Sequence, residues 1–326
     1  MLQMENKNKT KVNEFIIMVF PNLEHIQHIL FMFLLLTYLL IITGNIVVFS
    51  VIRLSPALQS PMYFFISVLS FLEIWYTAVT IPKMLANLIA EKKNISFIGC
   101  LLQIYFFQSL GVTEASLLTA MAYDRYLAIC NPLLYSAIMT SSFSMKLVVS
   151  SWLCGFLYPV TEIVLISKLP FCGPNQIEHI FCDLHPLMSL ACTDTSLSIK
   201  LEFVLNSCVV MGTIIFILFS YIKIIRVILH ISTSEGRQKA FSTCAAHLIV
   251  VFIFFGSAGF MYIRLTESYG VHYDKSVAVV YSVLTPLVNP IIYSLRNKEI
   301  RHAIQKILHQ NLSFTQNAAV LQITSI

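Results

Sequence analysis

The feature of this sequence that most restricts its fold is a series of long apolar stretches. An α-helix rises about 1.5 Å per residue, so about 20 residues cross the roughly 30 Å hydrocarbon core of a bilayer. Charged residues make up only 11% of the chain, against about 25% in a typical soluble domain. We therefore predict an all-α membrane protein, a bundle of seven transmembrane helices. The seven stretches lie at 28–52, 61–82, 98–125, 146–167, 199–222, 240–262 and 275–295.

The connections between these stretches are short, so we expect one helical bundle to use nearly the whole chain. We divide the sequence into an extracellular segment at 1–27, the seven-helix domain at 28–295 and a cytoplasmic tail at 296–326. The tail begins with an amphipathic pattern, which is typical of a short helix that lies on the inner leaflet. Its apolar face would consist of Ile300, Ile304, Ile307 and Leu308.

The orientation follows from features of the proposed extracellular side. Lys and Arg divide almost equally between the two sides, so the positive-inside rule does not decide. Two glycosylation sequons, at Asn8 and Asn94, and a cysteine-rich loop at 168–198 fall on one side of a seven-span chain. Glycans and disulfides belong to the extracellular face. We expect a plasma-membrane protein with an extracellular N-terminus, a cytoplasmic C-terminus and sugars at Asn8 and Asn94.

The eight cysteines form two groups. Cys130, Cys154, Cys208 and Cys244 lie in or beside spans, where cysteine is usually a small apolar side chain. The other four cluster at the outer face and allow three pairings, among which the spacing does not choose. These four are Cys100, Cys172, Cys182 and Cys192.

A layer of polar side chains is expected deep in the bundle. Counted from the cytoplasmic helix ends, Glu73 lies about 18 Å deep, Glu114 about 16 Å, Asn45 about 12 Å and Asn289 about 10 Å. Two carboxylates at one depth cannot both be ionised and unpaired, so Glu73 and Glu114 should share a proton or hold a cation such as sodium.

These two acids also support an alternative function, a transporter or channel. Neither inverted repeats nor paired broken helices accompany them, so we favour a regulatory or packing role. The sequence has no HExxH motif, no metal-spaced His and Cys set and no nucleophile with a base, which argues against an enzyme and a cofactor. It also has no basic run of the kind that binds nucleic acid.

An acid and an arginine, Asp124 and Arg125, stand near the inner end of the third span. Arg125 could simply extend to the headgroups. However, three other helices offer polar side chains at a similar depth, and a charge that can exchange partners makes a switch. Pro290 beside Asn289 breaks its helix and provides a hinge. The candidate switch residues are Asp124, Arg125, Tyr221, Lys239, Asn289, Pro290 and Tyr293.

Six motifs resemble those of the odorant receptors, a branch of the rhodopsin-like G-protein-coupled receptors, and the resemblance covers nearly the whole chain. The most specific are MAYDRYLAICNPLLY at 121–135 and KAFSTCAAHL at 239–248. The others are GN at 44–45, PMYFFISVLSFLE at 61–73, FSYIK at 219–223 and PLVNPIIYSLRN at 286–297. Two departures stand out, Glu73 where the family more often has Asp, and Phe254-Phe255-Gly256 where many relatives have Phe-Tyr-Gly.

The resemblance implies a function and a mechanism. Cys100 would pair with Cys182, and Cys172 with Cys192. Asp124 would hold Arg125 at rest, and outward movement of the sixth helix would open a cavity for a heterotrimeric G protein. The expected partners are a small volatile ligand, a stimulatory olfactory-type G protein that raises cAMP, and the lipid membrane.

The ligand is expected in the outer half of the bundle. Phe107, Gln108, Gly111 and Val112 share roughly one face of the third helix. No carboxylate occupies position 107, where amine receptors have Asp, and no lysine lies mid-span in the seventh helix to form a retinal Schiff base. We therefore expect a small, neutral, largely apolar odorant. By resemblance the opposite wall is formed by Leu205, Asn206, Val209, Phe255, Ala258, Gly259, Tyr262, Tyr281 and Ser282.

Overall fold

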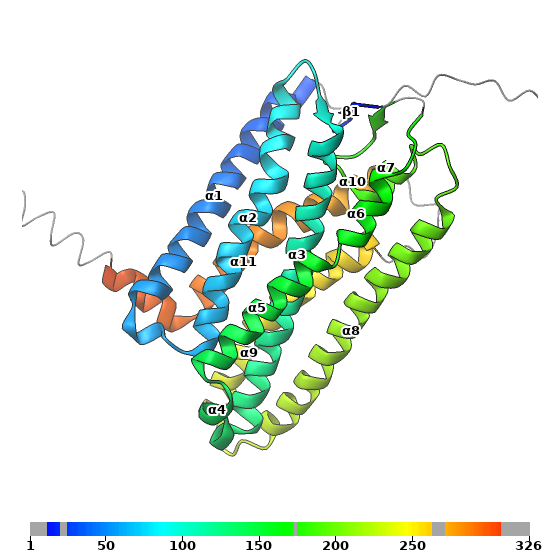
Figure 1. Cartoon of the computed structure of the whole chain (residues 1–326). Helices are drawn as coiled ribbons and strands as arrows, with labels where there is room; N and C mark the ends of the chain where they lie inside the picture. Colours follow the sequence, from blue (N-terminus) through cyan, green and yellow to red (C-terminus); the bar gives the residue numbers. More distant parts are fainter. Residues whose placement is uncertain (1–11, 20–24, 173–174, 263–270, 308–326) are drawn as a thin grey trace, which may run out of the picture.

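A bundle of long helices dominates the structure (Figure 1). The computed structural model describes residues 12–19, 25–172, 175–262 and 271–307. Five of the seven expected spans are single helices, and the other two are interrupted. The single helices are α1 (Gln27–Leu54), α2 (Pro61–Ile89), α3 (Phe97–Cys130), α8 (Ser196–Leu229) and α9 (Ser234–Tyr262). The predicted all-α, seven-helix fold is confirmed.

The fourth span is divided at Tyr158–Pro159 into α5 (Ser141–Leu157) and α6 (Val160–Ser167). Proline lacks the backbone N–H that would continue the helix, which explains the break. The seventh span consists of α10 (Val271–Val279), a π-helical turn η3 (Val280–Leu284) and α11 (Thr285–Arg296). Such π-helical turns are frequent at functional sites.

The outer surface of the bundle is strongly apolar. By length and composition, five helical segments within the described residues could cross a membrane. Large apolar side chains on α1 and α8 are exposed, for example Phe33 at 70% and Phe219 at 58%. Hydrocarbon is the environment in which such side chains cost nothing. The polar residues of α3 instead face the interior, where Gln103, Gln108, Glu114 and Asp124 are all buried.

One end of the bundle, which we call the disulfide end, is covered by a small sheet. Strand β1 (Glu14–Ile17) pairs antiparallel with β2 (Asn94–Ser96) and parallel with β3 (Gln176–Ile177). Phe15 is fully buried and packs against Phe97 and Phe171. The expected segment at 1–27 therefore contains an ordered strand, which the mixed polar sequence did not reveal, and its last residue is the first residue of α1.

Both disulfides of this end have the pairing that the resemblance implied. Cys100 of α3 is bonded to Cys182, and Cys172 to Cys192. The first holds the long loop against α3, and the loop then forms the short helix α7 (Leu184–Met188) before α8. Asn94 lies in β2, where its Nδ2 donates to Glu14 Oε2 at 2.6 Å, while Asn8 lies outside the described residues.

The opposite end, which we call the arginine end, contains Asp124 and Arg125. It also contains the short helices η2 (Pro56–Leu58) and α4 (Pro132–Ile138). A helix at 298–307 follows the seventh span. Its Ile300, Ile304 and Ile307 are buried or half-buried, whereas Arg301 and Lys306 are exposed. This agrees with the expected amphipathic helix, although Leu308 lies outside the described residues.

Candidate functional site

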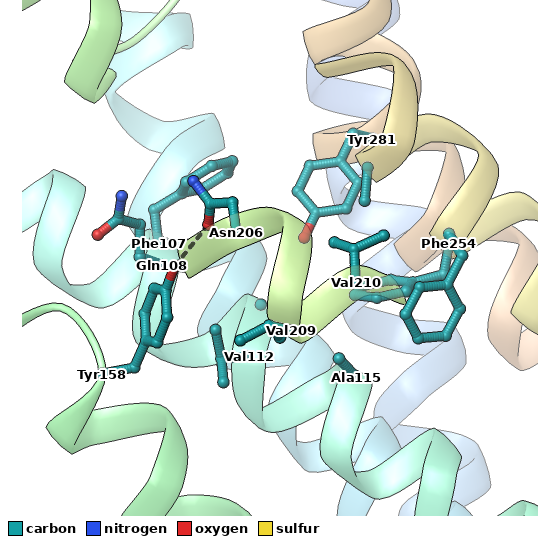
Figure 2. Close-up of a pocket in the computed structure, with 13 residues that line it drawn as sticks. Phe107, Gln108, Val112, Ala115, Tyr158, Asn206, Val209, Val210, Phe254 and Tyr281 are labelled. Carbon is teal, nitrogen blue, oxygen red and sulfur yellow. Dashed lines mark hydrogen bonds between the residues drawn. The ribbon is translucent and has the colours of Figure 1, made fainter. Parts of the chain in front are cut away.

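A cavity lies between α3, the α5–α6 junction, α8, α9 and η3 (Figure 2). It encloses about 440 Å³ of space between atoms, part of it open to the surroundings. The wall is mainly aromatic and aliphatic, with a few neutral polar groups. The lining residues are Phe107, Gln108, Gly111, Val112, Ala115, Tyr158, Asn206, Val209, Val210, Phe254, Phe255, Ala258 and Tyr281.

Most of the predicted ligand-binding residues line this cavity, but Leu205, Gly259 and Ser282 do not. Leu205 and Gly259 each lie one helical turn from a lining residue, Val209 and Phe255, so helical spacing alone does not separate them from the cavity wall. The predicted Tyr262 belongs to α9, but its side chain lies outside the described residues.

The sequence reasoning missed four lining residues, Ala115, Tyr158, Val210 and Phe254. Two of them could have been found from helical spacing alone. Ala115 is one turn from Gly111, and Val210 is one turn from Asn206. Tyr158 reaches the cavity because the helix breaks beside it at Pro159, and the proline was the available signal.

Two polar contacts shape the cavity. The Tyr158 hydroxyl donates to Asn206 Oδ1 at 2.7 Å and joins the α5–α6 junction to α8 (Figure 2). A Cβ atom built on Gly111 would lie 2.9 Å from the Tyr281 hydroxyl. The absence of a side chain on Gly111 therefore lets Tyr281 reach α3.

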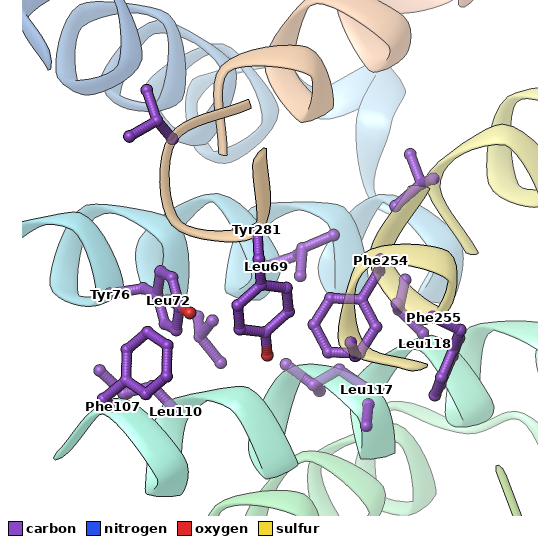
Figure 3. Close-up of a cluster of buried hydrophobic side chains, with 14 of the residues drawn as sticks. Leu69, Leu72, Tyr76, Phe107, Leu110, Leu117, Leu118, Phe254, Phe255 and Tyr281 are labelled. Atoms are coloured by element: carbon purple, nitrogen blue, oxygen red, sulfur yellow. The ribbon is translucent and has the colours of Figure 1, made fainter. Parts of the chain in front are cut away.

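The inner side of the cavity is a cluster of aromatic rings (Figure 3). The ring of Tyr281 lies 5.8 Å from those of Tyr76 and Phe107 and 5.6 Å from that of Phe254, measured between centroids. Such edge-to-face and tilted pairs fix ring orientation as well as burying apolar area. Four helical segments thus meet at one residue of the π-helical turn, and movement of Tyr281 would be felt by α2, α3 and α9.

The predicted polar layer assembles below this cluster. Asn289 Nδ2 donates to Glu73 Oε1, and Glu114 lies within interaction range of both residues. Asn45 Nδ2 donates to the Pro286 carbonyl at 3.4 Å, which ties α1 to α11. One oxygen of each carboxyl, Glu73 Oε2 and Glu114 Oε1, makes no hydrogen bond within the described residues. The layer therefore has room for the shared proton or cation that the sequence suggested, which stays a prediction.

At the arginine end, Arg125 is paired with its neighbour. Its Nη2 and Nε donate to Asp124 Oδ2 at 2.8 and 3.1 Å. The Tyr135 hydroxyl of α4 donates to the other oxygen, Oδ1, at 2.8 Å. Asp124 is fully buried, so these three bonds supply the partners that a buried carboxylate needs. Tyr135 is the last residue of the motif at 121–135, but the sequence did not predict its bond to Asp124.

Of the other predicted switch residues, Tyr221 lies within electrostatic range of Arg125 but makes no hydrogen bond to it within the described residues. Its hydroxyl is 2.7 Å from His247 Nδ1, and His247 Nε2 is 3.1 Å from the Leu118 carbonyl. The buried His247 thus joins α8, α9 and α3. Tyr293 is buried, and its hydroxyl has no hydrogen-bond partner within the described residues. Pro290 lies inside α11 and packs against Gly44 of α1, whereas the side chain of Lys239 lies outside the described residues.

The bundle has the fold of a solved seven-transmembrane receptor. Squid rhodopsin superposes with a TM-score of 0.68 over 89% of this chain and 87% of its own, at 18% identity, which shows the fold. A family model described as olfactory receptor matches residues 34–311. The chain belongs to this family, whose members are G-protein-coupled receptors and not enzymes.

The curated relatives agree over nearly their full length. Human olfactory receptor 6N1 is 56% identical over 305 residues, covering 94% of this chain and 98% of its own. Human olfactory receptor 6K3 is 55% identical, covering 93% of this chain and 92% of its own. The resemblance seen in the sequence motifs is therefore confirmed, and the chain is a multi-pass membrane receptor.

Proposed function

We propose that this receptor binds a small, neutral, mostly apolar odorant in the cavity of Figure 2 and activates a stimulatory olfactory-type G protein that raises cAMP. The observation that carries this proposal is the cavity itself. It is lined by apolar and neutral side chains, and one of its walls, α3, also carries Glu114 of the polar layer and the Asp124–Arg125 pair.

The composition of the wall favours a neutral ligand. Within the part of the chain that the structure describes, no charged residue lines the cavity, and its polar groups are amides and phenols. Recognition would then depend on dispersion and on removal of apolar surface from water. A ligand of about ten heavy atoms buries little area, so we expect micromolar or weaker affinity.

The path from ligand to G protein would run through Tyr281. A ligand that presses on Tyr281 or Phe254 displaces rings that pack on α2, α3 and α9. The same π-helical turn leads directly into α11, which carries Asn289 of the polar layer. Movement there would separate α9 from α3, break the His247–Leu118 contact and free Arg125 to exchange partners.

This mechanism sets the orientation in the plasma membrane. The segment 1–27, the sequons at Asn8 and Asn94 and the disulfide end would be extracellular, and the arginine end with the tail 296–326 would be cytoplasmic. The disulfides and the sequon of β2 lie at one end of the bundle, which supports this assignment. Glu73 and Glu114 would hold a proton or a sodium ion between them in the resting receptor.

The test is cAMP accumulation in cells that express the receptor with an olfactory-type stimulatory G protein, exposed to an odorant panel. We expect a dose-dependent response that is lost with Arg125→Ala at matched surface expression. Gln59→Ala, an exposed residue of the same end, is the control and should respond as wild type. A full response of Arg125→Ala would contradict the assigned switch, and no cAMP response to any ligand that binds would contradict the assigned G protein.

A further inference from the structure

Two deeply buried polar side chains beside the cavity make no ordinary hydrogen bond. Gln108 of α3 is 6% exposed, and neither its Nε2 nor its Oε1 has a hydrogen-bond partner within the described residues. Glu162 of α6 is 5% exposed, and both of its carboxyl oxygens are likewise without one. A buried polar group without a partner costs about 1–3 kcal/mol, so two such neighbours require an explanation.

The two side chains face the same region. Glu162 lies close enough to interact with the Gln108 amide, although the geometry is not that of a hydrogen bond. Gln108 lines the cavity, and in Figure 2 its amide lies on the side away from Phe254, beyond the Tyr158 ring. The cavity therefore has an apolar side at Phe254 and a polar side that leads from Gln108 toward Glu162.

The polar side is rich in hydrogen-bond acceptors. Glu162 interacts electrostatically with Asp183, and Tyr158 interacts with both Glu162 and Glu202. The ion pair found within the described residues, Asp124–Arg125, lies at the other end of the bundle, away from Glu162. The Tyr158 hydroxyl donates to Asn206, whereas the Gln108 Nε2 group is a donor without a hydrogen-bond partner within the described residues. A hydroxyl group entering here can accept from Gln108 and donate to Glu162, whereas a group without a polar hydrogen leaves the Glu162 oxygens unmatched.

We infer that Gln108 and Glu162 form a polar subsite that takes a hydrogen-bond-donating hydroxyl group of the ligand, while its hydrocarbon part lies against Phe254 and Tyr281. The inference rests on the proposed function and refines it. Both an alcohol and an ether or aldehyde would fit a neutral apolar cavity by size. Only the alcohol offers a proton to an acceptor, and a site with unmatched acceptors discriminates strongly against analogues without a donor.

The test measures binding directly, so that it does not depend on the G protein. Purified full-length receptor in lipid nanodiscs is titrated with sets of equal carbon skeleton, one linear and one cyclic, each carrying a hydroxyl, an aldehyde, a methyl ether or a primary amine. Binding is read from the ligand-induced rise in thermal stability. We expect the alcohol to bind about 10-fold more tightly than the aldehyde or ether of the same skeleton.

Three variants locate the preference. Glu162→Leu and Gln108→Leu should each reduce it to about 2-fold or less, whereas Glu162→Gln, which keeps an acceptor oxygen, should retain most of it. Glu91→Gln changes an exposed acid of the loop after α2 and should behave as wild type. If one leucine variant does not fold, the other still removes half of the subsite.

The outcomes separate the subsite from the proposed function. Equal affinity for alcohol and ether, or an alcohol preference that survives in both leucine variants, overturns the subsite and leaves the cavity intact. Tighter binding of the amine than the alcohol overturns the assignment of a neutral donor. If no compound of either skeleton binds up to millimolar concentration, the cavity is not the odorant site, and the proposed function and the subsite fail together.

Discussion

Two groups of buried polar side chains, one near each end of the bundle, differ in their hydrogen bonding. At the arginine end, Asp124 receives bonds from Arg125 and Tyr135, and both ring nitrogens of His247 have partners. Near the disulfide end, Gln108 and Glu162 are buried as deeply but have no hydrogen-bond partner within the described residues. The hydrogen bonds of Asp124 and His247 are already made and must be broken during activation. Those of Gln108 and Glu162 would be made with a ligand that enters the cavity.

Tyr293 is an informative exception at the arginine end. Its hydroxyl is buried without a hydrogen-bond partner within the described residues, although its neighbours are paired. The Tyr293 hydroxyl is therefore suited to form a hydrogen bond in another arrangement of the helices.

The packing that both ends share is most sensitive at Gly155. A Cβ atom there would overlap Thr113 Oγ1 and lie 2.5 Å from the backbone oxygen of Ser109, so α3 and α5 would have to separate. We expect Gly155→Ala to destabilise the receptor by about 3 kcal/mol or more and to abolish surface expression. Gly212→Ala of α8 is the matched control, because no atom lies within 4 Å of its Cβ, and it should express normally. Normal surface staining of Gly155→Ala would show that α3 and α5 do not approach each other so closely at Gly155.

Breaking the hydrogen bonds of His247 toward the arginine end should activate the receptor without ligand. His247→Phe removes the bonds to Tyr221 and to the Leu118 carbonyl that hold α9 against α8 and α3. Two lost hydrogen bonds at about 1 kcal/mol each correspond to a shift of about 10-fold or more toward the active arrangement. Basal cAMP, normalised to surface receptor, should therefore rise. An unchanged basal signal would mean that His247 stabilises both states equally, and a lower one would mean that it stabilises the active state more.

The cavity near the disulfide end should be affected by a smaller change, at Gly111. Gly111→Ala places a methyl group 2.9 Å from the Tyr281 hydroxyl, and a tyrosine end can shift where a backbone cannot. We expect normal expression but an odorant concentration for half-maximal response about 10-fold higher, since the ring cluster moves into the cavity. Gly259→Ala, with no atom within 4 Å of its Cβ, should leave the response unchanged. Equal responses of the two variants would exclude Tyr281 from the ligand path.

The smallest effect is expected at Tyr158. Tyr158→Phe removes the bond to Asn206 but keeps the ring, so the cavity changes by one hydroxyl. A loss of about 1 kcal/mol would weaken odorant potency about 5-fold, with no change in basal activity. Raised basal cAMP in this variant would contradict the separation of the two ends, because it would place a resting-state lock near the disulfide end.

The sequence predicted the parts of this structure that depend on local rules. The length and low polarity of the spans located the helices. The similar depths of Glu73, Glu114 and Asn289 predicted a polar layer, and these three side chains do lie together. The sequence did not predict strand β1, because its pairing depends on segments about 80 and 160 residues away. It also missed Tyr158 and Tyr135, which become functional through helix breaks and through the packing of short elements.

The prediction of cavity-lining residues is also limited because the sequence does not fix how each helix is rotated about its own axis. Asn206 and Ala258 line the cavity, while their predicted neighbours Leu205 and Gly259 do not. Depth in the membrane can be counted along the chain, but which side of a helix faces the cavity is set by packing against the other helices. For the same reason, Tyr221 was matched to Arg125 by depth and instead contacts His247.

The central claim is that a ligand near the disulfide end changes the arrangement of helices at the arginine end. The most direct measurement is the distance between spin labels on two exposed residues, Leu133 of α4 and Phe241 of α9, by double electron–electron resonance. In full-length receptor with its free cysteines replaced, an odorant agonist and G protein should lengthen this distance relative to receptor alone. The same distance distribution with and without agonist and G protein would contradict the account.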